Sequence, residues 1–89
     1  MPSVAIPCVT VRVVACAQLR DRLDASTSSV TLPAPATGQA LLRRLCECYP
    51  AAAPLLAVTR LAVNCEYVAL EAPLQDGDEV ILIPPVSGG

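Results

Sequence analysis

The sequence predicts an α+β fold in which one main helix packs across a mixed β-sheet. Three patterns support this prediction. Apolar and polar residues alternate from Cys8 to Cys16, apolar residues recur at helical spacing from Thr37 to Tyr49, and the run from Glu79 to Ile83 is almost continuously apolar. These patterns are typical of a strand, a helix and a buried strand, respectively. Because the chain has 89 residues, we expect a single domain.

The first two strands are expected to form a hairpin with a long connection. The alternating segment Cys8–Cys16 is the first strand, and SVTLP, from Ser29 to Pro33, is the second. Between them, Ala17–Leu23 is expected to form one or two helical turns, because two leucines lie four residues apart. The segment Asp24–Ser29 is expected to be a polar turn.

The main helix is expected to begin near Thr37 and to end before Pro50. Threonine is a favourable N-cap residue, and proline cannot continue a helix. The helix has an apolar face formed by Ala40, Leu41, Leu42, Leu45, Cys46 and Tyr49. The Ala-Ala-Ala-Pro segment after Pro50 is expected to be a loop or a short turn.

Three short strands are expected after the helix. Leu61–Asn64 and Glu66–Leu70 flank a tight turn, and Glu79–Ile83 follows the turn signal Asp76-Gly77-Asp78. The last strand is nearly all apolar, as expected for a central strand covered on both faces, and Pro84-Pro85 must end its pairing. Because the first and last strands are the most apolar, we expect them side by side in the middle of the sheet. A helix across one face of such a sheet gives a β-grasp.

The composition argues against several functions and favours a protein partner. The formal net charge is −2, and the chain contains neither Lys nor His. It therefore lacks a basic surface for nucleic acid, and also the commonest general base and metal ligand. Hydrophobic residues make up 54% of the sequence, so we expect an exposed apolar patch that a stable protein partner covers. No apolar run is long enough to span a membrane.

The cysteines are not spaced as a disulfide framework or as a metal site. They are Cys8, Cys16, Cys46, Cys48 and Cys65. Their number is odd, and Cys46 and Cys48 lie two apart in the expected helix, so they point to different sides and make a poor chelate. We expect free thiols in a reducing cytosol and no metal ion. A sulfur relay through them is not expected, because no base or cation nearby in the sequence activates a thiolate.

Three short sequence motifs occupy the C-terminal part of the chain. They read Asn64-x-Glu66-Tyr67-Val68, then Pro73-Leu74-x-Asp76-Gly77-Asp78-Glu79-Val80, then Pro84-Pro85-Val86-Ser87-Gly88-Gly89. Together with Ala17-Gln18-x-Arg20, they resemble the MoaD family, the small sulfur-carrying subunits of molybdopterin synthase. The resemblance spans most of the chain and is weakest from Asp24 to Ala36. It implies a ubiquitin-like β-grasp domain over residues 1–85 and a flexible C-terminal tail over residues 86–89.

The resemblance also implies a function for the last residue. The carboxylate of Gly89 is expected to be adenylated with ATP on an E1-like (MoeB-like) activating enzyme and then converted to a thiocarboxylate. The large (MoaE-like) synthase subunit takes the tail into its active site, where the sulfur passes to cyclic pyranopterin monophosphate to form molybdopterin. The resemblance further implies catalysis on the large subunit, no cofactor bound to this chain, and a heterotetramer of two small and two large subunits.

The tail residues suit insertion into a narrow channel. Gly88 and Gly89 have no side chains to collide with its walls, and Val86 to Gly89 can reach about 14 Å when extended. Pro84 and Pro85 stiffen the base of the tail, which should reduce the ordering entropy lost on insertion. The alternative is a disordered terminus on a β-grasp binding module.

The family pattern places partner contacts at Cys16, Tyr67 and Ile83. At the first two positions, bulky apolar residues are more usual in the family than Cys and Tyr. Ile83 lies just before the tail, where it could anchor an apolar docking patch. The alternative is that these residues simply fill the core, as apolar residues do in any fold.

Three other functions stay open on the sequence alone. β-Grasp sulfur carriers for thiamine synthesis or tRNA thiolation usually end in Gly-Gly, but they lack the preceding Pro-Pro-Val-Ser. A ubiquitin-like modifier is joined to lysines of target proteins. A plain interaction module has no covalent chemistry at all.

Overall fold

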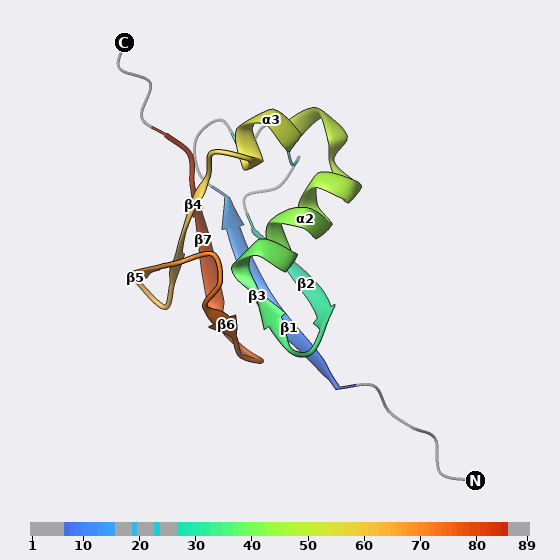
Figure 1. Cartoon of the computed structure of the whole chain (residues 1–89), viewed down its shortest axis with the longest axis vertical. Helices are drawn as coiled ribbons and strands as arrows, with labels where there is room; N and C mark the ends of the chain where they lie inside the picture. The colour runs from blue at the N-terminus through green and yellow to red at the C-terminus, as the bar shows by residue number, and fades with distance from the viewer. Residues whose placement is uncertain (1–6, 16–18, 20–22, 24–26, 86–89) are drawn as a thin grey trace, which may run out of the picture.

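The computed structural model describes residues 7–15, 19, 23 and 27–85 (Figure 1). Cys16 and residues 86–89 therefore lie outside the described residues. The elements follow one another as β1 (Cys8–Ala15), β2 (Thr27–Pro33), β3 (Ala36–Thr37), α2 (Gly38–Cys48), the 3-10 helix η1 (Pro50–Ala52), α3 (Ala53–Leu56), β4 (Arg60–Val63), β5 (Glu66–Val68), β6 (Pro73–Leu74) and β7 (Glu79–Ile83).

The strands of the described part of the chain form one mixed sheet of five and a small sheet of two. The order in the larger sheet is β2-β1-β7-β4-β5, and β3 pairs with β6 in the smaller one. β1 and β7 run parallel, whereas the β1–β2, β7–β4 and β4–β5 pairs are antiparallel. The expected hairpin is confirmed, and so is the placement of the first and last strands side by side in the sheet.

The hydrophobic core lies between the sheet and the helices, which cover one of its faces (Figure 1). Its largest fully buried side chains are Leu19, Leu41, Leu56, Leu61, Leu82, Val11, Val13 and Val80. Each such side chain contributes about 1.5–3 kcal/mol through burial. The alternation along β1 reflects burial of one face of the strand, as the sequence predicts. Val11 and Val13 face the core, while Arg12 between them is exposed.

The segment between β1 and β2 is described at two positions. The N–H of Leu23 donates to the carbonyl oxygen of Leu19 at 2.9 Å, and both side chains are at most 5% exposed. This bond agrees with the helical turn expected there, while the other residues of Ala17–Leu23 lie outside the described residues. β2 begins at Thr27, earlier than the expected Ser29, because the antiparallel ladder with β1 continues to Thr27 opposite Val14.

The main helix begins and ends where the sequence predicts. Oγ1 of Thr37 accepts a hydrogen bond from the N–H of Ala40 at 3.2 Å, so Thr37 is the N-cap. Tyr49 closes the last turn by donating its N–H to the carbonyl oxygen of Leu45. After Pro50, where the sequence predicts a loop or a short turn, the chain forms the single 3-10 turn η1 and the short helix α3, so the segment is helical and not a loop. Proline is compatible with the first turn of a helix, where its missing N–H has no intrahelical acceptor.

The structure adds a small sheet and shortens one expected strand. β3 and β6 pair over only two residues each, which is too short to leave an alternating pattern in the sequence. β5 ends at Val68 rather than at Leu70. The chain turns there toward the start of α2, where the carbonyl oxygen of Leu70 accepts a hydrogen bond from the N–H of Gln39 at 2.9 Å.

The turn Asp76-Gly77-Asp78 fixes the start of β7 against β1. Gly77 has a φ of 90°, which glycine adopts without strain, and its N–H donates to the carbonyl oxygen of Thr10 at 2.8 Å. The N–H of Thr10 donates in turn to Oδ1 of Asp76 at 2.8 Å. The N–H of Arg12 donates to the carbonyl oxygen of Asp78, also at 2.8 Å.

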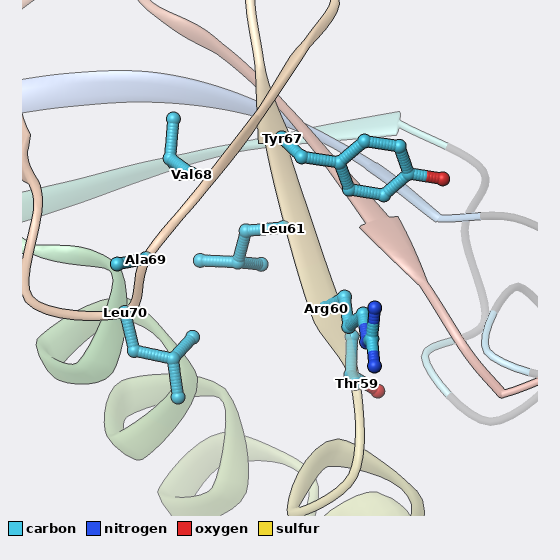
Figure 2. Close-up of a pocket in the computed structure, with 7 residues that line it drawn as sticks. All are labelled: Thr59, Arg60, Leu61, Tyr67, Val68, Ala69 and Leu70. Carbon is cyan, nitrogen blue, oxygen red and sulfur yellow. The ribbon is translucent and has the colours of Figure 1, made fainter.

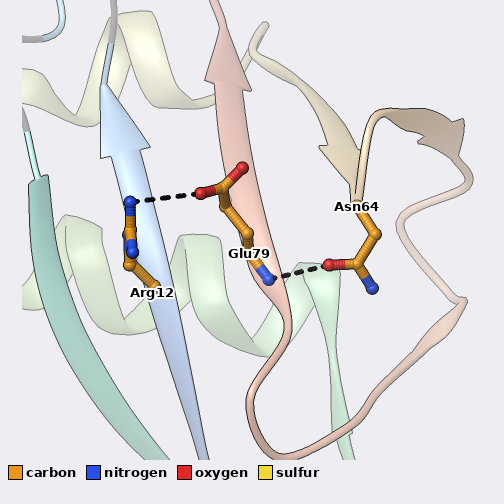
Figure 3. A network of polar contacts seen from close by, with 3 residues as sticks. All are labelled: Arg12, Asn64 and Glu79. Carbon is orange, nitrogen blue, oxygen red and sulfur yellow. Dashed lines mark hydrogen bonds and ion pairs between the residues drawn. The ribbon is translucent and has the colours of Figure 1, made fainter.

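Asn64 connects the same turn to the β4–β5 hairpin. Its Nδ2 donates to Oδ1 of Asp78 at 3.0 Å, and its Oδ1 accepts from the N–H of Glu79 at 3.1 Å. The carboxylate of Glu79 also contacts the guanidinium of Arg12 at 3.4 Å (Figure 3). Asn64 and Asp78, which belong to the pattern shared with the MoaD family, thus have structural roles in joining three strands.

The β4–β5 turn contains two residues with left-handed backbone, and this conformation can be tested by mutation. Asn64 and Cys65 have φ values of 50° and 74°, as in the two-residue hairpin turns that favour Asn-Gly. Left-handed backbone costs a residue with a Cβ about 1–2 kcal/mol. We expect Cys65→Gly to raise the free energy of unfolding in urea by about 0.5–1 kcal/mol. Cys65→Ala should leave it unchanged, and a loss of stability in Cys65→Gly would contradict the turn.

Candidate functional site

β7 presents its apolar side chains to two different environments. Val80 and Leu82 are 0% exposed in the core, whereas Ile81 and Ile83 are half-buried on the sheet face opposite the helices, which we call the open face. The expectation that the last strand is covered on both faces is wrong. Alternate residues of a strand point to opposite faces, and among the described residues the helices lie on only one face of the sheet (Figure 1).

An apolar row crosses the open face. Val14 of β1 pairs with Ile81 of β7, which also pairs with Ala62 of β4. Ala62 pairs in turn with Tyr67 of β5. Paired residues project from the same face of a sheet, so these four side chains form a continuous apolar row over four strands. Tyr67 is its most exposed member, at 71%. An exposed apolar surface of this kind indicates a contact with a partner.

A groove lies where β7 ends and the tail begins. Ile83, the last residue of β7, pairs with Arg60, the first residue of β4. A cavity of about 390 Å³ is lined there by Val58, Arg60, Tyr67, Ile83, Pro84 and Pro85, and we call it the tail-base groove. Because Tyr67 belongs to both features, the groove continues the apolar row to the base of the tail.

Two of the three predicted interface residues come together at this groove. Tyr67 and Ile83 both line it, and neither belongs to the core cluster, so they do not fill the core. Their contact with a partner stays a prediction, and Cys16 lies outside the described residues. Sequence reasoning missed Val58 and Arg60, because only the pairing of β4 with β7 brings this part of the chain beside Ile83.

A second cavity adjoins the tail-base groove. Its volume is about 380 Å³, and it is lined by Thr59, Arg60, Leu61, Tyr67, Val68, Ala69 and Leu70 (Figure 2). It lies where the chain leaves the sheet after Val68, the last residue of β5. Arg60 and Tyr67 line both cavities, so these two side chains stand at the boundary between them.

The tail begins directly at this surface. The pairing of β7 with β4 ends at Ile83, and the prolines that follow have no N–H with which to extend it. Pro84 is half-buried and Pro85 is exposed. Val86–Gly89 lie outside the described residues, so the roles assigned to Val86, Ser87, Gly88 and Gly89 stay predictions. The base of the tail, from Ile83 to Pro85, does lie within the described residues.

The described part of the chain holds one ion pair and no cluster of metal-binding groups. Arg12 and Glu79 make the one ion pair found within residues 7–15, 19, 23 and 27–85. Over the same ranges, no three His, Cys, Asp or Glu residues gather as metal ligands would. The helices described here are all too short or too polar to cross a membrane.

The fold and the position of this surface define a class of protein, the ubiquitin-like β-grasp proteins. A putative molybdopterin converting factor subunit 1 from Pyrococcus furiosus superposes with a TM-score of 0.79 and 27% identity, over 88% of this chain and 99% of that one. SAMP1 from Haloferax volcanii superposes with a TM-score of 0.78 and 27% identity, over 90% and 99% of the two chains. The predicted fold class is confirmed.

The sequence then places the chain within this class. The profile of the ThiS family matches residues 13–89, and the chain belongs to this family. The molybdopterin synthase sulfur carrier subunit of Arabidopsis thaliana is 31% identical over 81 residues, which cover 91% of this chain and 84% of the relative. The subunit of the same name from Dictyostelium discoideum is 43% identical over 51 residues, and the match spans only 59% of that relative's length.

A complex of two subunits is also among the similar structures. It contains subunits 1 and 2 of the molybdopterin-converting factor from Helicobacter pylori, and one of its chains superposes with a TM-score of 0.61 and 26% identity, over 91% of this chain and all of that one (100%). The resemblance to the MoaD family is thus confirmed by sequence and by structure.

The division of β7 into a core face and an open face can be tested by stability. Leu82→Asp buries a carboxylate among aliphatic side chains, and we expect it to cost about 4 kcal/mol or more of unfolding free energy. Ile83→Asp places the same group on the open face opposite Arg60, and we expect it to cost about 1 kcal/mol or less. Urea denaturation of both variants measures the difference. Equal destabilisation would mean that Ile83 belongs to the core.

Proposed function

We propose that this chain is the sulfur carrier subunit of molybdopterin synthase, and that the carboxylate of Gly89 carries the sulfur. The observation behind the proposal is the junction of the tail with the open face, since Pro84 and Pro85 line the same groove as Tyr67 and Ile83. A partner that fills this groove must contact the base of the tail. The relatives from Arabidopsis and Dictyostelium support the assignment to this synthase.

The proposed chemistry starts from a poor electrophile. A carboxylate resists nucleophilic attack, so it is first adenylated with ATP on an E1-like activating enzyme, with release of pyrophosphate. A sulfur nucleophile then attacks the acyl carbon, AMP leaves, and a thiocarboxylate results. In this scheme ATP binds to the activating enzyme, and this chain contributes the carboxylate and the surface that positions it.

The second half of the proposal is delivery of the sulfur. The thiocarboxylate enters the active site of a MoaE-like large subunit and donates its sulfur to cyclic pyranopterin monophosphate, forming molybdopterin after two such transfers. The tail from Val86 to Gly89 spans about 14 Å when extended, so the folded body stays outside the active site. β7 holds the base of this tail, because it is paired on both edges, with β1 and with β4.

The proposed contact with the large subunit is the open face. The apolar row and the tail-base groove form one surface, and Tyr67 supplies an aromatic side chain of the kind that anchors interfaces. The Helicobacter complex of subunits 1 and 2 supports such a pairing. We propose two small subunits bound to a dimer of large subunits, in the cytosol, where thiols such as Cys46 and Cys48 stay reduced.

The ubiquitin-like modifiers provide the second candidate function. The Haloferax protein SAMP1 has the same fold at 27% identity, and conjugation to a target amine also begins with activation of a C-terminal carboxylate. The two functions differ in the fate of the acyl group. A sulfur carrier ends as a free thiocarboxylate, whereas a modifier becomes attached to larger proteins. The names of the sequence relatives favour the carrier.

The position of the terminal carboxylate can be tested by changing the tail length. Deletion of Gly89 should shorten the reach by about 3.5 Å, and misplacement by 1 Å can already cost about 100-fold in rate. Addition of one residue after Gly89 turns the acyl group into an internal peptide. We expect both variants to fail in thiocarboxylate formation, measured by intact mass, and in pterin conversion. Normal sulfur delivery by either would refute the proposal.

The contact with the large subunit can be tested at Ile83. Ile83→Asp should weaken binding to the large subunit by about 100-fold, because it removes an apolar contact from the covered surface and adds a carboxylate that the partner must desolvate. Gln39→Asp adds the same charge on α2, across the molecule from the open face, and serves as the control. Titration calorimetry measures both. If the two variants bind like the unmodified protein, the interface lies on another face.

A further inference from the structure

We infer that the large subunit presents a carboxylate to Arg60, and that this ion pair determines which large subunit the carrier accepts. The inference rests on the proposed function, because it requires the open face to be the covered face. Arg60 is the first residue of β4 and pairs with Ile83, the last residue of β7. Among the described residues that line the tail-base groove, Arg60 is the charged one.

Arg60 lies between the two cavities of this end of the molecule. It lines the tail-base groove with Val58, Ile83 and the two prolines, and it lines the adjoining cavity with Leu61 and Val68. In Figure 2 the side chains of Arg60 and Tyr67 project to the same side of β4. A partner that covers Tyr67 and Ile83 cannot avoid covering Arg60.

The charge of Arg60 is not balanced within the described part of the chain. Arg12, also on the open face, contacts Glu79 at 3.4 Å. No carboxylate of the described residues lies within ion-pair distance of Arg60. The side chains that line the tail-base groove with it are apolar or aromatic, and two of them are largely exposed, Val58 at 57% and Tyr67 at 71%.

Covering this surface therefore imposes a chemical requirement on the partner. In the free protein, water solvates the exposed guanidinium of Arg60. Once a partner excludes that water, a buried charge without a counter-charge is strongly unfavourable. The planar guanidinium donates two parallel hydrogen bonds to a carboxylate, so Asp or Glu is the matching group. A large subunit with an apolar or basic residue at this point would be rejected.

The first test compares two arginines by removal of their charge. Arg60→Gln should weaken binding to the large subunit by about 30-fold or more, because the partner's carboxylate is left buried and unpaired. Arg43→Gln removes the same charge from the exposed side of α2 and should change nothing. The affinity of the unmodified protein should also fall more steeply with added salt than that of Arg60→Gln. Equal affinities and equal salt dependence for all three proteins would overturn the inference.

The second test uses the absence of lysine from the sequence. Arg60→Lys introduces the only side-chain amine of the chain, and a zero-length carbodiimide should couple it to the partner's carboxylate in the complex. Peptide mapping then identifies the Asp or Glu that is joined to position 60. Arg43→Lys is the matched control and should give no such product. A cross-link from position 43 but none from position 60 would contradict the proposed pair.

A third experiment, the assay of thiocarboxylate formation with the activating enzyme, distinguishes failure of this inference from failure of the proposed function. Thiocarboxylate formation by Arg60→Gln should equal that of the unmodified protein. If it falls while binding to the large subunit is unchanged, the carboxylate belongs to the activating enzyme and the inference is wrong, although the carrier function stands. If the unmodified protein neither gains sulfur nor binds the large subunit, the proposed function itself fails and the inference fails with it.

Discussion

The parallel pairing of β1 with β7 is the interaction on which the rest of the structure depends. It joins the first strand of the described chain to the last, Val13 beside Val80, and it places β7 inside the sheet with β4 on its other edge. The buried residues of both strands then form the floor on which α2 packs. The pairing depends on polar contacts at the start of β7, where Asp76 and Asp78 hold the turn against β1.

This pairing also determines what the end of the chain can do. A strand paired on both edges is a rigid base, so the residues that follow Ile83 leave the sheet from a fixed point. The period of two divides the apolar side chains of β7 between the core and the open face. Val80 and Leu82 hold the strand in place, while Ile81 and Ile83 contribute an apolar surface beside the tail. The short strand β7 thus both anchors the sheet and contributes to the proposed partner surface.

Much of the fold could be predicted because its signals are local. The N-cap at Thr37, the alternation along β1 and the turn at Gly77 each depend on a few neighbouring residues. The small β3–β6 sheet leaves no pattern in the sequence. The proline-containing segment after Tyr49 suggests a loop or a short turn, whereas the structure accommodates its prolines in the first turns of η1 and α3. The expectation that β7 is covered on both faces is also wrong. An apolar strand sequence does not reveal whether its second face is covered by another layer of the same protein or by a partner.

The candidate site was only partly accessible from the sequence. The family pattern pointed to Tyr67 and Ile83, but Arg60 and Ala62 join them only through pairing between strands that are distant in the sequence. The same pattern contains Asn64 and Asp78, whose hydrogen bonds serve the fold and not the chemistry. A shared motif therefore mixed residues of two kinds, and the structure was needed to separate them.

The central claim is that the body of the protein presents a terminal carboxylate that accepts sulfur. The most direct measurement is the intact mass of the unmodified protein after incubation with the activating enzyme, ATP and a sulfur donor, followed by fragmentation to locate the change. The account predicts replacement of one oxygen by sulfur at Gly89, reversed when the large subunit and the pterin substrate are added. An unchanged mass, or sulfur found on a cysteine such as Cys65, would contradict it.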